Sequence, residues 1–406
     1  MNPGAATDET VSASTEVLSD ARRRIGADAI HAWVAIATDD LVASWRPGPG
    51  PLSGLALGVK DIIDLAGMPT RCGSAITSAD PAERSASLVQ RLIGLGAVPV
   101  GKTVTTEFAY FSPGPTENPK AKGHTPGGSS SGSAAAVAAG HVPLALGSQT
   151  AGSLTRPAAY CGVAGLVLSH GTVPLDGFSG LASSLDSAGV IAATCAGLQR
   201  VYDALFPGPA ATAVPRRVLV WRGDELDAVS AEMAAAVDSA ARAIRQAGIV
   251  VEPLEDRQHV ARLAADHRTV MAYEAARERR DLYVQRQDVS PQLRELLESG
   301  AAVPDDEYRE ARERTAASAA FFADLLAEDA VVLGPAATGA APHGLAATGS
   351  PVMSRPWQLL GLPQVCVPGC ADAAGLPLGV QLIGARGTES LLLRLGETLE
   401  SSLDAS

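Results

Sequence analysis

The sequence predicts an α/β protein in which helices cover both faces of a large β-sheet. Short and almost entirely apolar runs alternate along the chain with segments of helical period, as in LALGV (55–59), SASLVQRLIGLG (85–96) and AVPV (97–100). A strand that is apolar at every position must be buried on both faces, whereas a strand with one wet face alternates in polarity. Apolar runs of this kind occur toward both ends of the chain, which favours one domain over residues 1–406.

The other elements follow from local signals. Residues 16–40 are predicted as a helix, and SAAAVAAG (133–140) as a helix that stops at its final glycine. Residues 224–330 differ from the rest because they are charged and amphipathic, and they are predicted to be mainly helical. The remaining strands are expected at VPLALGS (142–148), AVVLGP (330–335), QVCVPG (364–369) and LGVQLIG (378–384), followed by a closing helix at TESLLLRLGETLE (388–400).

Composition excludes several classes of protein. Hydrophobic residues make up 46% of the chain and charged residues 19%, which is typical of a globular protein. The net charge of −12 and the aromatic content of 4% argue against a nucleic-acid partner, which requires a basic surface. The sequence has neither the pattern of a signal peptide nor an apolar run of about twenty residues, so we expect no membrane insertion.

Cysteine usage indicates a reducing compartment. The five cysteines are an odd number, lie in apolar surroundings and form no CxxC pair. We therefore expect reduced, buried side chains in a cytoplasmic protein, and the sequence leaves a homodimer open. The cysteines are Cys72, Cys161, Cys195, Cys366 and Cys370.

Lysine is scarce enough for each residue to be considered singly. Lys102 follows Gly96 and Gly101 with the spacing of a phosphate-binding P-loop, which continues to Thr103. The four residues between the glycines are the predicted strand AVPV, so there is no glycine-rich loop to surround a phosphate, and we interpret the match as fortuitous. The other three lysines are Lys60, Lys120 and Lys122.

A second motif, GSSSG at 128–132, fits the G-x-S-x-G turn that carries the nucleophile of α/β-hydrolases. It would make Ser130 the nucleophile of an esterase. Such a turn follows a strand, but here a polar segment precedes it. The best candidate for the catalytic histidine, His343, lies in a Gly/Ala loop without a neighbouring Asp. Both features argue against this interpretation.

A third pattern is much longer. Its parts are GVKD (58–61), EFAYFSPGPTENP (107–119), TPGGSSSGSAAAVAAGHVPLALGSQTAGSLTRPAAYCGVAGL (125–166), SSLDSAG (183–189), WQLLGLPQVCVPG (357–369) and GLPLGVQLIGA (375–385). In their order and spacing these segments resemble the amidase signature family. The resemblance covers most of the chain from about residue 50, with a signature core at about 55–195. It implies the amidase signature fold, with a large central mixed sheet, and a middle (about 224–330) that shapes the substrate pocket.

The resemblance also implies a Ser–cis-Ser–Lys triad. Ser153 in TAGSLTR would be the nucleophile, Ser129 the bridging serine whose preceding peptide bond is cis, and Lys60 the base. Independent chemistry is consistent with this role: a serine hydroxyl needs a base, and a lysine serves only if burial lowers its pKa. Lys60 follows an apolar run, so burial is plausible. The alternative is a buried ion pair between Lys60 and a carboxylate such as Asp64 or Asp186.

The segment before the nucleophile supplies backbone donors. By the same resemblance, the N–H groups of Thr150, Ala151 and Gly152 would form an oxyanion hole for an amide carbonyl. The expected reaction is amide hydrolysis through an acyl-enzyme, releasing ammonia or an amine, and it requires no metal or cofactor.

The chain departs from the commoner family pattern beside the nucleophile. Gln149 replaces an Asp, and Arg156 follows Ser153 by three positions instead of two. In this detail the chain is similar to malonamidase, whose corresponding Arg holds a substrate carboxylate. The resemblance thus implies a small amide that carries a carboxylate, or a ureide-like analogue. The alternative is that Arg156 forms a structural ion pair with a protein carboxylate.

Two other functions remain open. The chain could be the glutaminase-type subunit of an amidotransferase, which would need a partner to receive ammonia. It could also be an inactive binding protein that keeps the fold, although the presence of Lys60, Ser129 and Ser153 together argues against this.

Overall fold

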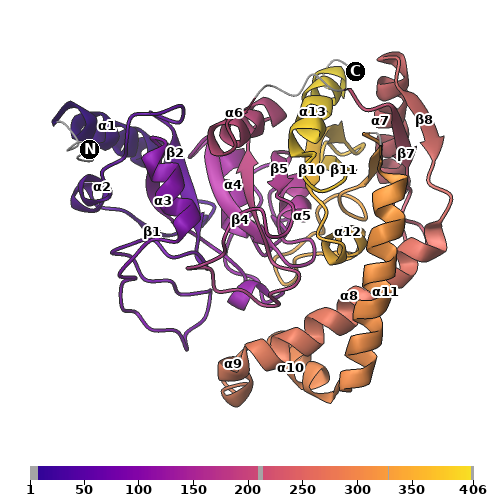
Figure 1. Ribbon diagram of the computed structural model, residues 1–406. Coiled ribbons are helices and arrows are strands. Elements are labelled where there is room, and N and C mark those ends of the chain that lie inside the picture. The colour runs from indigo at the N-terminus through magenta and orange to yellow at the C-terminus, as the bar shows by residue number, and fades with distance from the viewer. Residues whose placement is uncertain (1–7, 209–213, 328, 404–406) are drawn as a thin grey trace.

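The computed structural model describes residues 8–208, 214–327 and 329–403 and is built around one mixed sheet of eleven strands (Figure 1). The strand order is β1-β3-β2-β4-β6-β5-β10-β11-β9-β7-β8. The α/β prediction with a large mixed sheet is therefore confirmed. The strands are β1 Trp33–Ile36, β2 Ala56–Lys60, β3 Val98–Thr103, β4 Leu144–Gln149, β5 Ala164–Val167, β6 Ser187–Ala192, β7 Arg217–Val220, β8 Val250–Pro253, β9 Val331–Pro335, β10 Gln364–Ala371 and β11 Pro377–Ile383.

Helices cover both faces of this sheet. The pair α4–α5 packs on one side of β4 and β10, and α6, α7 and α13 form a second group that packs on β5, β6, β9 and β10. The two groups make few contacts with each other, because the sheet separates them. The helices are α1 Asp8–Ile25, α2 Asp39–Trp45, α3 Ser87–Gly94, α4 Ser131–Ala138, α5 Thr155–Cys161, α6 Cys195–Leu205, α7 Ala231–Gln246, α8 Arg257–Glu278, α9 Arg280–Val284, α10 Pro291–Ala302, α11 Asp305–Leu325, α12 Arg355–Leu359 and α13 Glu389–Leu403, with 3-10 turns at η1 Glu107–Ala109 and η2 Val352–Ser354.

The predicted helix at 16–40 is wrong in its second half. Helix α1 ends at Ile25, and Gly26 follows with a φ of +54°, a conformation that ends helices and suits glycine. Residues 33–36 then form β1, which pairs antiparallel with β3 at the edge of the sheet. A strand only four residues long carries too little periodicity to be distinguished from a helix without its partner strand.

The predicted helical middle also contains a strand. Helices α7 to α11 account for most of residues 224–330, but β8 interrupts them and pairs parallel with β7 at the other edge of the sheet. Its residues are mostly exposed, so it lacks the apolar run by which the other strands were predicted. Beyond β8, α8, α9, α10 and α11 form an arm that projects from the sheet layer, and α8 packs against α10, α11 and α12 (Figure 1).

The centre of the sheet brings together the segments that carry the motifs. Strands β2 and β4 are parallel neighbours, so their carboxyl ends, Lys60 and Gln149, lie at the same edge. Ligand sites in α/β proteins usually form at this edge, because the loops that leave the strands converge there. The loops before α4 and α5 start from the same region, which places the two serine-rich motifs beside Lys60.

The five cysteines are free, and four of them are buried as expected, whereas Cys370 is half-exposed near the end of β10. No helix among the described residues is long and apolar enough to cross a membrane.

Candidate active site

Lys60 is the last residue of β2 and is fully buried. Its Nζ donates hydrogen bonds to the Oγ atoms of Ser129, at 2.6 Å, and of Ser148 on β4, at 2.9 Å. Among the described residues, the Nζ of Lys60 is thus hydrogen-bonded to two hydroxyl groups and to no carboxylate. The predicted alternative, an ion pair with Asp64 or Asp186, is not what the structure contains.

Burial sets the charge of this lysine. Desolvation lowers the pKa of Lys60 to about 7, and the nearby negative charge of Asp186 partly opposes that shift. The adjacent carboxylate is engaged elsewhere, because Asp61 forms a buried ion pair of 3.1 Å with Lys102. Lys60 therefore has a substantial neutral fraction near neutral pH, which is what a general base needs.

Ser129 lies at the start of the segment that leads into α4. The peptide bond between Gly128 and Ser129 is cis. A Cβ atom on Gly128 would lie 2.9 Å from the side chains of Thr106 and Thr348, so only glycine fits at this position. Next to it, the N–H of Ser130 donates to the carbonyl oxygen of Ser153 at 3.0 Å, which joins the two serine motifs.

The turn at 150–153 connects β4 to α5. Gln149 caps the following helix, because its Oε1 accepts hydrogen bonds from the N–H groups of Leu154 and Thr155 at 3.0 and 3.1 Å. Within the described chain, the N–H groups of Ala151, Gly152 and Ser153 donate to no protein acceptor. Three consecutive free donors are the arrangement that an oxyanion hole requires.

Thr150 is held from both sides of this turn. Its Oγ1 donates to Oδ1 of Asp186 at 2.5 Å, and its carbonyl oxygen lies 2.8 Å from Nε2 of His267 on α8. Burial and the charge of Arg355 lower the pKa of His267 to about 3, so the ring is neutral. Its Nδ1 is buried without a partner, which assigns the single ring proton to Nε2 and makes that atom the donor to Thr150.

These residues surround a small pocket of about 20 Å³, room for little more than one water molecule. Ser129, Ser153 and Arg156 lie in its wall, together with Thr150 and Ala151. No cluster of three or more His, Cys, Asp or Glu side chains among the described residues is arranged to hold a metal ion.

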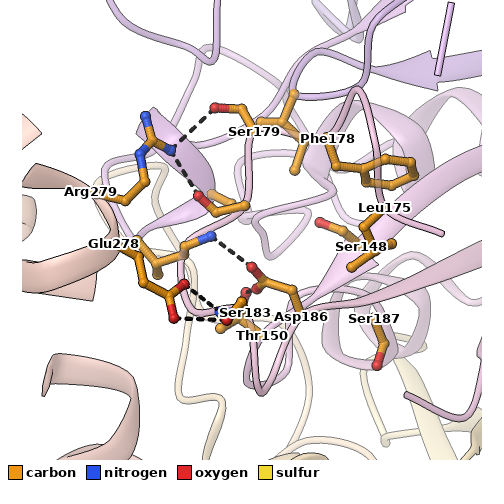
Figure 2. A pocket seen from close by; sticks show the side chains of 14 residues that line it. Ser148, Thr150, Leu175, Phe178, Ser179, Ser183, Asp186, Ser187, Glu278 and Arg279 are labelled. Atoms are coloured by element: carbon orange, nitrogen blue, oxygen red, sulfur yellow. Dashed lines mark hydrogen bonds between the residues drawn. The ribbon is translucent and has the colours of Figure 1, made fainter. Parts of the chain in front are cut away.

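A larger cavity of about 380 Å³ adjoins this pocket and shares Ala109, Thr150 and Leu181 with it. Figure 2 shows Asp186 between Thr150 and the loop at 179–183, while Glu278 and Arg279 hold that loop from the end of α8. The larger cavity thus provides space beside the small pocket into which a substrate can extend.

Comparisons with known proteins identify the family. Residues 27–393 match the model of the family described as Amidase. The chain belongs to the amidase signature family. Its members act on small amide substrates, and the chain is an amidase-type hydrolase.

Several relatives are similar over most of their length. AtzE, the 1-carboxybiuret hydrolase subunit of Pseudomonas sp. (strain ADP), is 34% identical over 391 residues, 87% of this chain and 84% of that protein. A glutamyl-tRNA(Gln) amidotransferase subunit of Chloroflexus aggregans (strain MD-66 / DSM 9485) is 31% identical over 408 residues, 87% and 83% of the two chains. The peptide amidase of Stenotrophomonas maltophilia superposes with a TM-score of 0.78 at 26% identity, covering 97% and 94%.

The structure brings most of the predicted amidase residues together. Lys60 and Ser129 are hydrogen-bonded, and Ser129 shares one pocket with Ser153, Thr150 and Ala151. Gly152 is packed against Pro351 beside this pocket.

Arg156 also lines the pocket, but it forms no ion pair with a described carboxylate. Its Nη2 donates to the carbonyl oxygen of Gly128 at 2.5 Å and to Thr348 Oγ1 at 3.3 Å, and its Nη1 donates to the carbonyl of Gly349.

The competing motifs have structural roles. The residues of the P-loop match form β3, and Lys102 is buried against Asp61 and Thr70. The Oγ of Ser130 donates to the carbonyl of Ser148 at 3.4 Å, and no described histidine is hydrogen-bonded to it; His343 instead packs edge-to-face on His124.

Sequence reasoning missed His267, because a single histidine on a charged helix carries no signal until its partner across the chain is known.

We expect the acid limb of the pH profile of kcat/KM to report the ionisation of Lys60. The neutral amine is the active form, so kcat/KM should rise through an apparent pKa of about 7 and level off above it. Because the charge of Asp186 raises the pKa of Lys60, Asp186→Asn should move this limb to lower pH. Rate profiles between acid and alkaline pH measure the shift; a limb that stays in place or moves upward contradicts the electrostatic role given to Asp186.

Lys102→Met should destabilise the fold without removing the chemistry. It leaves the buried carboxylate of Asp61 without its cation, a change that costs about 3–5 kcal/mol of unfolding free energy. Urea denaturation measures the loss, and Lys102→Met combined with Asp61→Asn should recover part of it. The folded fraction should keep its activity, whereas Lys60→Ala should lose it; the reverse pattern would identify Lys102 as the base.

His267→Leu should lower kcat by about tenfold with little change in KM, because the loss of one hydrogen bond raises the activation free energy by ~1.4 kcal/mol. The reason is that His267 holds the Thr150 carbonyl, and with it the peptide whose N–H is predicted to stabilise the negative charge of the transition state. His259 is a matched control, since it lies on the same helix and bonds to Ser318. Equal effects of His267→Leu and His259→Leu on steady-state rates would contradict a specific role.

Proposed function

We propose that this protein is an amidohydrolase that cleaves a small amide through an acyl-enzyme on Ser153. Neutral Lys60 takes a proton from Ser129, which takes the proton of Ser153 as its Oγ bonds to the amide carbonyl carbon. The oxyanion is stabilised by the N–H groups of residues 150–153. The C–N bond breaks when the proton returns through Ser129 to the leaving nitrogen, and water then cleaves the ester by the same relay.

One observation carries this proposal: a fully buried lysine with a pKa of about 7 donates to Ser129, which shares a pocket with Ser153. A lysine that served only structure would pair with a carboxylate, because an unpaired buried ammonium is costly. The family membership supports the same roles, since the segments that carry Lys60, Ser129 and Ser153 resemble the family's motifs.

The substrate that we propose is small and carries a carboxylate, or is a ureide-like analogue of such an amide. Three observations support this class: the pocket is small, it contains the guanidinium of Arg156, and one relative is named for its action on 1-carboxybiuret. Arg156 contributes its positive charge and its Nε–H, which has no protein partner. The similarity to malonamidase beside the nucleophile points to the same class.

An amidotransferase component is the second candidate, because several relatives are subunits of glutamyl-tRNA(Gln) amidotransferases. That function would require a partner chain to receive the ammonia. Hydrolysis of a small amide by the isolated chain at a full rate would argue for the hydrolase; activity that appears only with glutamine and a partner would argue for the amidotransferase.

The direct test compares two serine variants on a panel of amides, with ammonia release as the readout. Ser153→Ala should lose at least about 10³-fold in kcat, since the nucleophile itself is removed, while Ser130→Ala should keep most of the activity. A mechanism-based acylating agent should add one acyl group per chain, located on Ser153 by mass spectrometry. An active Ser153→Ala together with an inactive Ser130→Ala would favour the α/β-hydrolase alternative and overturn the proposal.

A further inference from the structure

A second arginine lines the small pocket and has a different environment from Arg156. Arg355 begins α12 and lies in the pocket wall beside Pro351. Its Nε, like that of Arg156, is buried without a hydrogen-bond partner, and no ion pair joins the Arg355 guanidinium to a described carboxylate. A buried, unsatisfied N–H of a charged group costs free energy, so its retention in a pocket indicates a partner that binds from outside the protein.

Arg156 is already engaged with the protein. Three of its donor contacts are to the oxygens of Gly128, Thr348 and Gly349, so two of its guanidinium nitrogens hold the backbone on either side of the pocket. In particular, it holds the carbonyl that precedes Ser129. Arg355 has none of these contacts, and its side chain is the freer of the two guanidinium groups.

The charge of the pocket is unbalanced. Two arginines line it, and none of the lining residues is acidic. Burial and the positive charge of Arg268 lower the pKa of Arg355, and burial lowers that of Arg156 to about 10. Arginine stays protonated at these values, so the pocket contains an uncompensated positive charge that an anion would neutralise.

The backbone of Arg355 is anchored to the catalytic segment. On one side, Ser354 Oγ lies 2.7 Å from Thr155 Oγ1, and on the other, Gln358 Nε2 donates to the carbonyl oxygen of Gln149 at 3.1 Å. Both contacts flank the turn that carries Ser153. The backbone that carries Arg355 is thereby held at a fixed place relative to the nucleophile, which is the arrangement expected of a receptor for a substrate group.

We propose that Arg355 binds the carboxylate of the substrate and is the residue that selects an acidic amide over a neutral one. A carboxylate accepts two parallel hydrogen bonds from a guanidinium, which matches the free edge of Arg355. Because Arg355 and Ser153 line the same pocket, the carboxylate would lie only a few bonds from the scissile carbonyl, as in a monoamide of a short dicarboxylic acid, and the rest of the substrate would extend into the adjoining cavity. This inference rests on the proposed amidohydrolase function and adds the group that determines its specificity.

The experiment compares the monoamides of oxalic, malonic and succinic acids with the corresponding neutral diamides. For the preferred acid, Arg355→Gln should raise KM by about 10- to 100-fold, because a charged hydrogen-bonded contact is lost. The KM for the corresponding neutral diamide should change by no more than about threefold. Arg268→Gln is the matched control, since Arg268 is an exposed neighbour that does not line the pocket. This variant should change the KM of neither substrate. Arg156→Gln should instead lower kcat for both.

Binding gives a readout that does not depend on turnover. Calorimetry with Ser153→Ala and the dicarboxylate anions should detect one site, which Arg355→Gln in the same background abolishes and Arg355→Lys restores in part. The assignment would be overturned if Arg156→Gln lost the selectivity for acidic over neutral amides while Arg355→Gln kept it. It would also be overturned if Arg355→Gln lost equal activity on acidic and neutral amides. These outcomes leave the hydrolase function standing; only a fully active Ser153→Ala would remove that function as well.

Discussion

The site depends on one side chain that is withdrawn from water without a carboxylate partner. Desolvation of Lys60 removes the preference for the charged form, and the two serine hydroxyls that it contacts stabilise the ammonium less than an ion pair would. The nearby charge of Asp186 opposes the shift only in part, and the adjacent Asp61 is paired with Lys102 at 3.1 Å. The two buried lysines thus differ in their partners: Lys60 contacts hydroxyl groups, whereas Lys102 pairs with a carboxylate.

Around this lysine, the turn at 150–153 is held by residues from distant parts of the chain. Gln149 caps α5, Asp186 binds the Thr150 hydroxyl, and His267 binds the Thr150 carbonyl from the projecting arm. A turn whose donors must face a pocket cannot satisfy them within itself, so its conformation has to be enforced by such contacts. The helical middle of the chain therefore contributes to the catalytic centre as well as to the shape of the cavity beside it.

The fold was largely accessible from the sequence because most strands lie in the centre of the sheet. A central strand is buried on both faces and appears as an apolar run, as at β2, β4, β9, β10 and β11. Five strands were not predicted: β5, β6 and β7 inside the sheet, and the two edge strands β1 and β8. The edge strands β1 and β8 are only four residues long and partly exposed, and pairing with β3 and β7 makes them strands.

The sequence by itself determined the family and the fold class and predicted Lys60, Ser129 and Ser153 as the candidate triad, because spaced motifs record which residue types the chemistry requires. Only the tertiary structure decided what surrounds them. The contact of His267 with Thr150 joins positions over a hundred residues apart, and the difference between Arg156, which holds backbone carbonyls, and Arg355, which is free, depends on where each guanidinium lies. Charge and hydrogen-bonding capacity are properties of the residue, but whether they are satisfied is a property of the packed neighbours.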